Sequence, residues 1–106
     1  MSTYNPDRWL LLKLGEVQKV LAGWSGGYLD GDSWKLSSGV NNIEEDGDYW
    51  LFHNYSGSIY KCHKNAQGTT ILSGAKYAEY EKHCKKAGAN FETITDIKPG
   101  KVELPS

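Results

Sequence analysis

The chain has 106 residues, a formal net charge of −1, 39 % hydrophobic and 24 % charged residues, so we expect one folded domain over residues 1–106. The near-neutral charge argues against nucleic acid as a partner, because non-specific nucleic-acid binders are basic overall. The longest apolar run, residues 9–12, is far shorter than the roughly 20 residues of a membrane span, and the N-terminus lacks the pattern of a signal peptide, so we expect no membrane association.

Strand patterns dominate the first part of the chain, after a start over residues 1–7 that we expect to be loose. Residues 8–14 and 17–24 are two apolar runs joined by a glycine turn, which predicts a β-hairpin. Residues 33–37 alternate between polar and apolar side chains, and residues 40–44 predict a further short strand.

The middle of the chain is its most strand-like part. The Asp-Gly pair within residues 45–47 predicts a tight hairpin turn, because this pair suits the primed turns that match strand twist. Residues 48–55 alternate between two faces and are rich in aromatic side chains, and residues 58–64 predict another strand.

Helical periodicity begins after a polar turn. Residues 73–87 place one stripe of partly apolar side chains at helical spacing, with Ser73 as the expected N-cap and Gly88 as the stop. Residues 91–97 predict a final strand, and residues 99–106 are expected to be a loose tail, with a short edge strand in residues 101–106 as the alternative. The helical stripe within residues 73–87 consists of Tyr77, Tyr80, Cys84 and Ala87.

Together these elements predict an α+β fold, with one twisted, mostly antiparallel sheet of about five to seven strands and one helix from the C-terminal half packed on it. The helical stripe is narrow and partly made of tyrosine. It can cover only part of a sheet, so we expect some aromatic side chains to stay exposed or to lie in an interface.

Two cysteines with neighbouring histidines suggest two kinds of chemistry. Cys62-His63 and His83-Cys84 contain the two-Cys, two-His set of zinc sites, but neighbours on a strand point to opposite faces, and zinc ligands are usually spaced by two to four residues. A Cys–His enzyme needs an activated thiol and a nearby base, and no nucleophile motif surrounds either cysteine. We therefore expect free thiols in a reducing compartment, no metal, no cofactor and no catalytic residue.

Aromatic side chains interleaved with small polar and basic residues mark a candidate ligand site in residues 23–37 and 53–64. Aromatic faces can stack on nucleobases, while lysines, hydroxyls and glycine amides can hold phosphate. The same side chains suit cross-strand packing or protein interfaces, and that alternative stays open. The candidate ligand-binding residues are Trp24, Tyr28, Trp34, Lys35, Tyr55, Ser56, Gly57, Ser58, Lys61, His63 and Lys64.

Charges are unevenly spread along the chain. Residues 29–48 hold six acidic side chains and one lysine, whereas residues 61–86 hold six lysines and two glutamates. Such asymmetry can mark two binding faces, or two halves that attract each other within the fold.

Three stretches carry a resemblance to a known group of proteins. Trp9, residues 31–39 (GDSWKLSSG) and residues 54–64 (NYSGSIYKCHK) occur in an order that resembles small orphan proteins of tailed bacteriophages, over residues 8 to about 68. The resemblance transfers no binding or catalytic residue. It implies a small phage protein in the cytoplasm of a bacterial host, where such proteins often counter host defences.

Three hypotheses follow, none of which requires catalysis. The first is a binding protein that counters a host defence by sequestering a cyclic or ADP-ribose-type nucleotide signal. The second is a protein–protein inhibitor of a host defence complex, of the anti-CRISPR or anti-restriction kind, that uses its acidic segment or its aromatic surface. The third is a minor virion or accessory structural protein. A small sheet domain with exposed aromatic side chains is also expected to associate, most simply as a homodimer.

Overall fold

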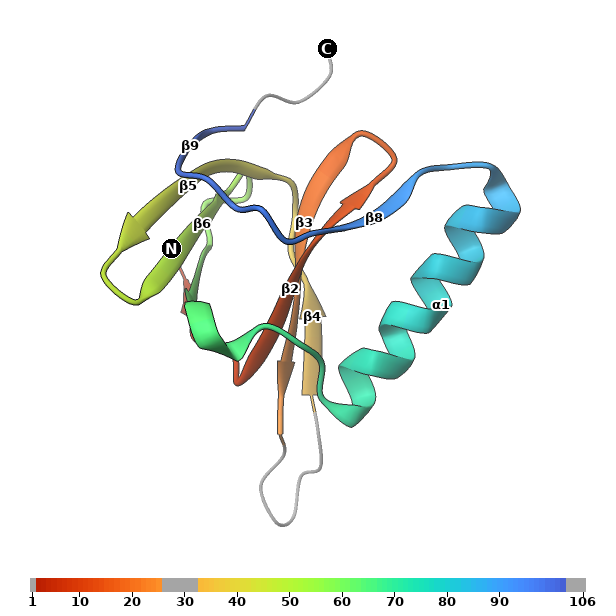
Figure 1. Cartoon of the computed structure of the whole chain (residues 1–106), viewed down its shortest axis with the longest axis horizontal. Helices are drawn as coiled ribbons and strands as arrows, with labels where there is room; N and C mark the ends of the chain where they lie inside the picture. Colours follow the sequence, from red (N-terminus) through yellow and green to blue (C-terminus); the bar gives the residue numbers. More distant parts are fainter. Residues whose placement is uncertain (1, 26–32, 103–106) are drawn as a thin grey trace.

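Two β-sheets and one long helix make up the part of the chain that the computed structural model describes, residues 2–25 and 33–102 (Figure 1). The α+β class and a helix in the C-terminal half confirm the expectation from the sequence. The strands are β1 (Thr3–Tyr4), β2 (Arg8–Leu14), β3 (Val17–Trp24), β4 (Ser33–Leu36), β5 (Val40–Asp46), β6 (Tyr49–Asn54), β7 (Ile59–His63), β8 (Phe91–Ile94) and β9 (Gly100–Lys101); the helices are the 3-10 turn η1 (Lys64–Ala66) and α1 (Ile71–Ala87).

The strands divide between a five-stranded sheet, in the order β1-β7-β6-β5-β9, and a four-stranded sheet, in the order β4-β3-β2-β8. β1 and β7 run parallel, and the other paired strands of the described residues run antiparallel. The expectation of a single sheet with five to seven strands was therefore wrong. Alternation along a strand shows which side chains share a face, but it does not show which strands pair.

The central strands of the four-stranded sheet are buried on both faces. Trp9 and Leu11 of β2 and Val20 of β3 point toward the five-stranded sheet, and the intervening Leu12 and Leu21 point the other way; all five are at most 1 % exposed. Strands covered on both sides need apolar side chains at successive positions, which explains why β2 reads as a continuous apolar run. The core between the sheets also takes in Phe52, Tyr60 and Cys62 from the other sheet.

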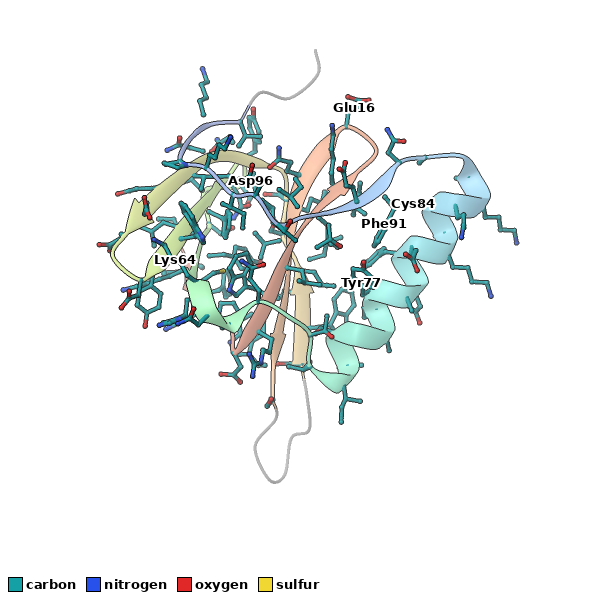
Figure 2. The ribbon with its side chains drawn as sticks, in the orientation of Figure 1. Glu16, Lys64, Tyr77, Cys84, Phe91 and Asp96 are labelled. Atoms are coloured by element: carbon teal, nitrogen blue, oxygen red, sulfur yellow. The ribbon has the colours of Figure 1, made fainter. Side chains whose placement is uncertain are left out.

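α1 covers the outer face of the four-stranded sheet, where it contacts β3, β4 and β8. Ser73 is buried, and Tyr77, Tyr80 and Cys84 are half-buried, at the spacing of one helical stripe. Tyr77 and Phe91 point toward each other between helix and sheet (Figure 2), with ring centroids 5.0 Å apart. Ala87, which was expected in this stripe, is exposed in the last turn of the helix.

The two ends of α1 are capped differently from one another. Thr70, not Ser73, is the N-cap: its Oγ1 accepts a hydrogen bond from the Ser73 N–H at 3.2 Å, while Ser73 Oγ accepts one from the Thr70 N–H at 2.8 Å. The expected N-cap was wrong because Ser73 is the third helical residue of a reciprocal capping box. Gly88 ends the helix as expected, at a φ of 72° that favours glycine.

Both chain ends pair with the five-stranded sheet where they are described. β1 pairs with β7, so the expected loose start over residues 1–7 is wrong for this strand. β9 pairs with β5 at the edge of the sheet, so residues 100–101 are not loose but follow the alternative of a short edge strand. Met1 and residues 103–106 lie outside the described residues. No helix within residues 2–25 and 33–102 is long and apolar enough to cross a membrane.

Replacement of Gly23 in β3 should destabilise the fold, because α1 begins directly against it. A Cβ atom at Gly23 would lie 2.6 Å from Ser73 Oγ and 2.8 Å from Thr70 Oγ1, and both side chains are buried in the capping box. We expect Gly23→Ala to lower the free energy of unfolding by about 1–3 kcal/mol, the usual range for overpacking. Urea denaturation followed by circular dichroism measures this. An unchanged midpoint would mean that the start of α1 does not sit on β3.

Candidate functional site

Two of the candidate ligand-binding residues lie around Tyr4, between the edges of the two sheets. The Tyr4 ring is 6.3 Å from the Trp24 ring and 4.9 Å from the Tyr60 ring, and Lys35 Nζ is 5.2 Å from its centroid. The Trp24 indole N–H donates a hydrogen bond to the Asn5 carbonyl at 3.1 Å. Burial, followed by the nearby Tyr4 and Cys62, raises the pKa of Tyr60 to about 12, so its phenol stays protonated at neutral pH. Trp24 and Lys35 therefore belong to a cluster that joins β1, β3, β4 and β7.

Trp34 lies on the opposite face of β4 from Lys35, because successive strand side chains alternate. Its ring is 6.2 Å from the Tyr80 ring of α1, nearly edge to face, and Lys76 Nζ is 5.2 Å from its centroid. Trp34 thus packs between the sheet and the helix, and it is separated by the sheet from Trp24.

The residues from Tyr55 to Ser58 form the turn between β6 and β7. Ser38 Oγ donates to Ser56 Oγ at 3.0 Å, and Ser56 Oγ lies 3.1 Å from Ser58 Oγ. Gly57 takes a φ of 92° and donates its N–H to the Asn54 carbonyl. These hydroxyls are already hydrogen-bonded within the chain, whereas the Tyr55 side chain is 54 % exposed.

The three remaining candidates come from β7 and the turn after it. Lys61 and His63 lie on the outer face of the five-stranded sheet, where Lys61 Nζ and the His63 ring are 4.7 and 5.0 Å from the centre of the Tyr49 ring. Lys64 Nζ instead lies 4.8 Å from the Trp50 ring centroid and forms an ion pair with Glu45.

The described candidate residues therefore do not converge on one site. They occupy the edge cluster around Tyr4, the helix-covered face, the β6–β7 turn and the outer face of the five-stranded sheet. Tyr28, the remaining candidate, lies outside the described residues. All three lysines that were expected to hold phosphate lie over an aromatic ring of the same chain. The negative face of the ring attracts the ammonium group.

The cysteines and histidines are also separated. Among residues 2–25 and 33–102, no three His, Cys, Asp or Glu side chains group closely enough to hold a metal ion. Cys62 points into the core, while its neighbour His63 lies on the outer face. Both thiols are free, and burial raises the pKa of the Cys62 thiol well above its ordinary value.

A groove that sequence reasoning did not single out lies at one open end of the two sheets. β8 belongs to the four-stranded sheet and β9 to the five-stranded sheet, so residues 95–99 must cross from one to the other (Figure 1). We call this crossing segment the strap. Between the strap and the sheets lies a cavity of about 390 Å³, the strap groove, which also involves residues at both ends of the strap.

The strap groove is lined by both apolar and polar groups, and its charged side chains lie at the rim. Its apolar side chains come from both sheets and the strap: Leu11, Ile43, Ile94, Ile97 and Val102. Gly100 pairs with Ile43 and carries no side chain, and a Cβ atom there would meet nothing within 4 Å. The polar lining consists of Gln18, Asp96, Lys98 and Lys101.

The rim charges remain available to solvent. Lys98 and Asp96 form an ion pair at 3.6 Å, but their side chains are 78 % and 85 % exposed. Ion pairs this exposed contribute little to stability, so the Lys98 ammonium can exchange its partner for another anion at small cost. The lysines at the rim can thus attract negative charge, although the Asp96 carboxylate lies beside them.

A faint signal for this groove was present in the sequence. Ile94, Ile97 and Val102 are apolar residues spaced through a polar segment, the first two in the expected final strand and Val102 in the expected loose tail. Apolar residues spaced in this way indicate that the segment packs against the rest of the fold. The sequence does not show that it packs near Leu11 and Ile43, because these residues lie on strands far away in the sequence.

Comparison with protein families, with curated proteins and with solved structures finds no match to this chain.

Burial should make Cys62 unreactive in the folded protein. The thiolate is the reactive form, and a raised pKa lowers its population at neutral pH. We expect alkylation of Cys62 by iodoacetamide at pH 7 to be at least about tenfold slower in the native protein than in urea, with peptide mass spectrometry as the readout. Half-buried Cys84 supplies the comparison in the same molecule. Equal alkylation of Cys62 in both conditions would contradict its position in the core.

Proposed function

We propose that this protein is a non-enzymatic binding protein that holds a small nucleotide-type anion in the strap groove and so removes it from solution. The observation that carries the proposal is the groove itself, a concavity of about 390 Å³ lined by apolar side chains from both sheets and by polar groups that include two lysines and Asp96. Small-molecule sites are typically clefts of about 300–1,000 Å³, lined mainly by apolar side chains with a few polar groups that orient the ligand.

The lining suits each part of such a ligand. Ile94 and Ile97 offer aliphatic surface to the flat face of a base, and the Gln18 amide can both donate and accept hydrogen bonds at the edge of a base. The ammonium groups of Lys98 and Lys101 attract phosphate oxygens. Because both lysines are exposed, affinity should fall as salt is added.

Binding without catalytic turnover is supported by the surroundings of the Cys62 thiol. The Cys62 thiol is buried in the core, away from the groove lining, and its raised pKa keeps it protonated. The resemblance to phage proteins gives the proposal its setting, in which the captured molecule is a cyclic or ADP-ribose-type nucleotide that signals in host defence. Sequestration of such a signal requires affinity and slow release, and it requires no catalytic group.

Native mass spectrometry tests the proposal, with the purified protein exposed to a pool of cyclic dinucleotides, cyclic trinucleotides and cyclic ADP-ribose isomers. We expect one class to bind with its mass unchanged. The double variant Lys98→Glu, Lys101→Glu should weaken that binding at least tenfold, because it replaces attraction of phosphate by repulsion. Titration calorimetry gives the two dissociation constants.

The matched control is Lys82→Glu, Lys86→Glu, which makes the same change in net charge on the exposed side of α1. It should bind as the unmodified chain does. Loss of binding in Tyr55→Ala, with the groove variant unaffected, would move the site to the β6–β7 turn. The absence of any adduct would overturn the proposal, and a processed ligand mass would replace binding by catalysis.

A further inference from the structure

The outer face of the five-stranded sheet has no cover within the described residues. α1 packs on the four-stranded sheet, and no described helix or strand packs on this second face (Figure 1). Cross-strand partners share a face, so the pairing of β5, β6 and β7 assigns its side chains. Its centre holds Tyr49 and Leu51 of β6 and Ile59 of β7, all half-buried.

The charges on this face follow its strands. In one row across the sheet, Glu44 of β5 pairs with Leu51, which pairs with Lys61 of β7. In the next row, Asp46 of β5 pairs with Tyr49, which pairs with His63 of β7. The acidic side chains therefore lie on β5 and the basic ones on β7, with an aromatic or aliphatic side chain between them.

Local contacts hold these groups in place on the face. His53 Nε2 lies 2.9 Å from Glu44 Oε1, and Lys61 Nζ lies 4.7 Å from the centroid of the Tyr49 ring. The Asn65 N–H donates to His63 Nδ1 at 3.1 Å, so Nδ1 acts as the acceptor and Nε2 is the ring nitrogen that carries a proton.

A face with this pattern complements a second copy of itself. Consider two copies stacked face to face, with a twofold axis that lies between the two sheets and runs parallel to β6. This axis brings β7 of one chain opposite β5 of the other, and each row of side chains then faces the same row of the second copy. Glu44 then faces Lys61 of the second copy, and Asp46 faces His63 of the second copy. A twofold axis across the strands would instead place Lys61 opposite Lys61 of the second copy, so the charges select the first arrangement.

The outer strands β1 and β9 are compatible with the charge complementarity between the two copies. Asn42, His53 and Ile59 form the third row, which Lys101 of β9 and Thr3 of β1 extend at opposite edges. The same axis places Lys101 opposite the neutral Thr3 of the second copy. Leu51 meets Leu51 of the second copy at the centre, where two packed sheets bury their inner side chains.

We propose that two copies of this chain form a symmetric dimer through the outer face of the five-stranded sheet, with β5 of each copy opposite β7 of the other. This interface is separate from the strap groove in its side chains, except that Lys101 lies at the edge of both. The dimer does not depend on the proposed ligand, and either proposal can fail alone.

Two charge reversals test the interface when they are made in separate chains. Glu44→Lys places two lysines opposite each other at both symmetry-related contacts, and Lys61→Glu does the same with two glutamates. Each variant should raise the dimer dissociation constant at least tenfold, because like charges face each other twice. An equimolar mixture should restore dimerisation as a heterodimer, since lysines of one chain then face glutamates of the other at both contacts.

Analytical ultracentrifugation over a wide concentration range measures the dissociation constants, and native mass spectrometry distinguishes the heterodimer by mass. Rescue in the mixture also shows that both variants are folded. Glu81→Lys and Lys82→Glu on exposed positions of α1 make the same charge changes and should leave dimerisation unaltered. A monomer at every concentration of the unmodified chain would overturn the proposal. So would a dimer that neither reversal weakens, or a mixture without preferential heterodimers.

Discussion

Trp9 holds the two sheets in their relative position. Its side chain is 0 % exposed, its ring centroid lies 5.3 Å from that of Phe52 in the opposite sheet, and its indole N–H donates to the His63 carbonyl at 2.7 Å. Its own carbonyl accepts from the Gly68 N–H, on the segment that leads into α1. One residue of β2 therefore connects the four-stranded sheet to the end of β7 and to the approach of the helix. A buried indole contributes most when its N–H is paired in this way, because an unpaired buried donor is costly.

The packing of the two sheets and α1 also determines which surfaces of the fold stay open. The four-stranded sheet is covered on one face by the other sheet and on its opposite face by α1, so its side chains serve packing. Within the described residues, the five-stranded sheet is covered on one face only. The surfaces that stay open there include the end of the two sheets beneath the strap and the uncovered face of β5, β6 and β7. The proposed ligand site and the proposed dimer interface thus lie on different surfaces that share Lys101 at their edges.

Several aromatic side chains make contacts with lysines of the same chain. Lys35, Lys61 and Lys64 lie over Tyr4, Tyr49 and Trp50, in pairs that join the two sheets, two neighbouring strands, and η1 with β6. Such contacts are worth about 0.5–1 kcal/mol each at exposed sites. Aromatic rings with lysines and hydroxyls nearby are also what a nucleotide site requires, so composition alone does not separate the two uses. Which of the two uses applies depends on which residues contact each other in the folded chain.

By itself the sequence determined the local structure. The apolar runs of β2 and β3, the alternation of β6 and the glycine at 88 follow from backbone geometry and side-chain periodicity, which act over a few residues. It also indicated the α+β class and the helix. Only the tertiary structure decided that the strands form two sheets, and that Trp24 and Trp34 lie on opposite faces of one of them. It alone brought Leu11, Ile43 and Ile97 together around the strap groove. These outcomes depend on contacts between residues distant in sequence, and a one-dimensional pattern carries no information on which distant strands will pair.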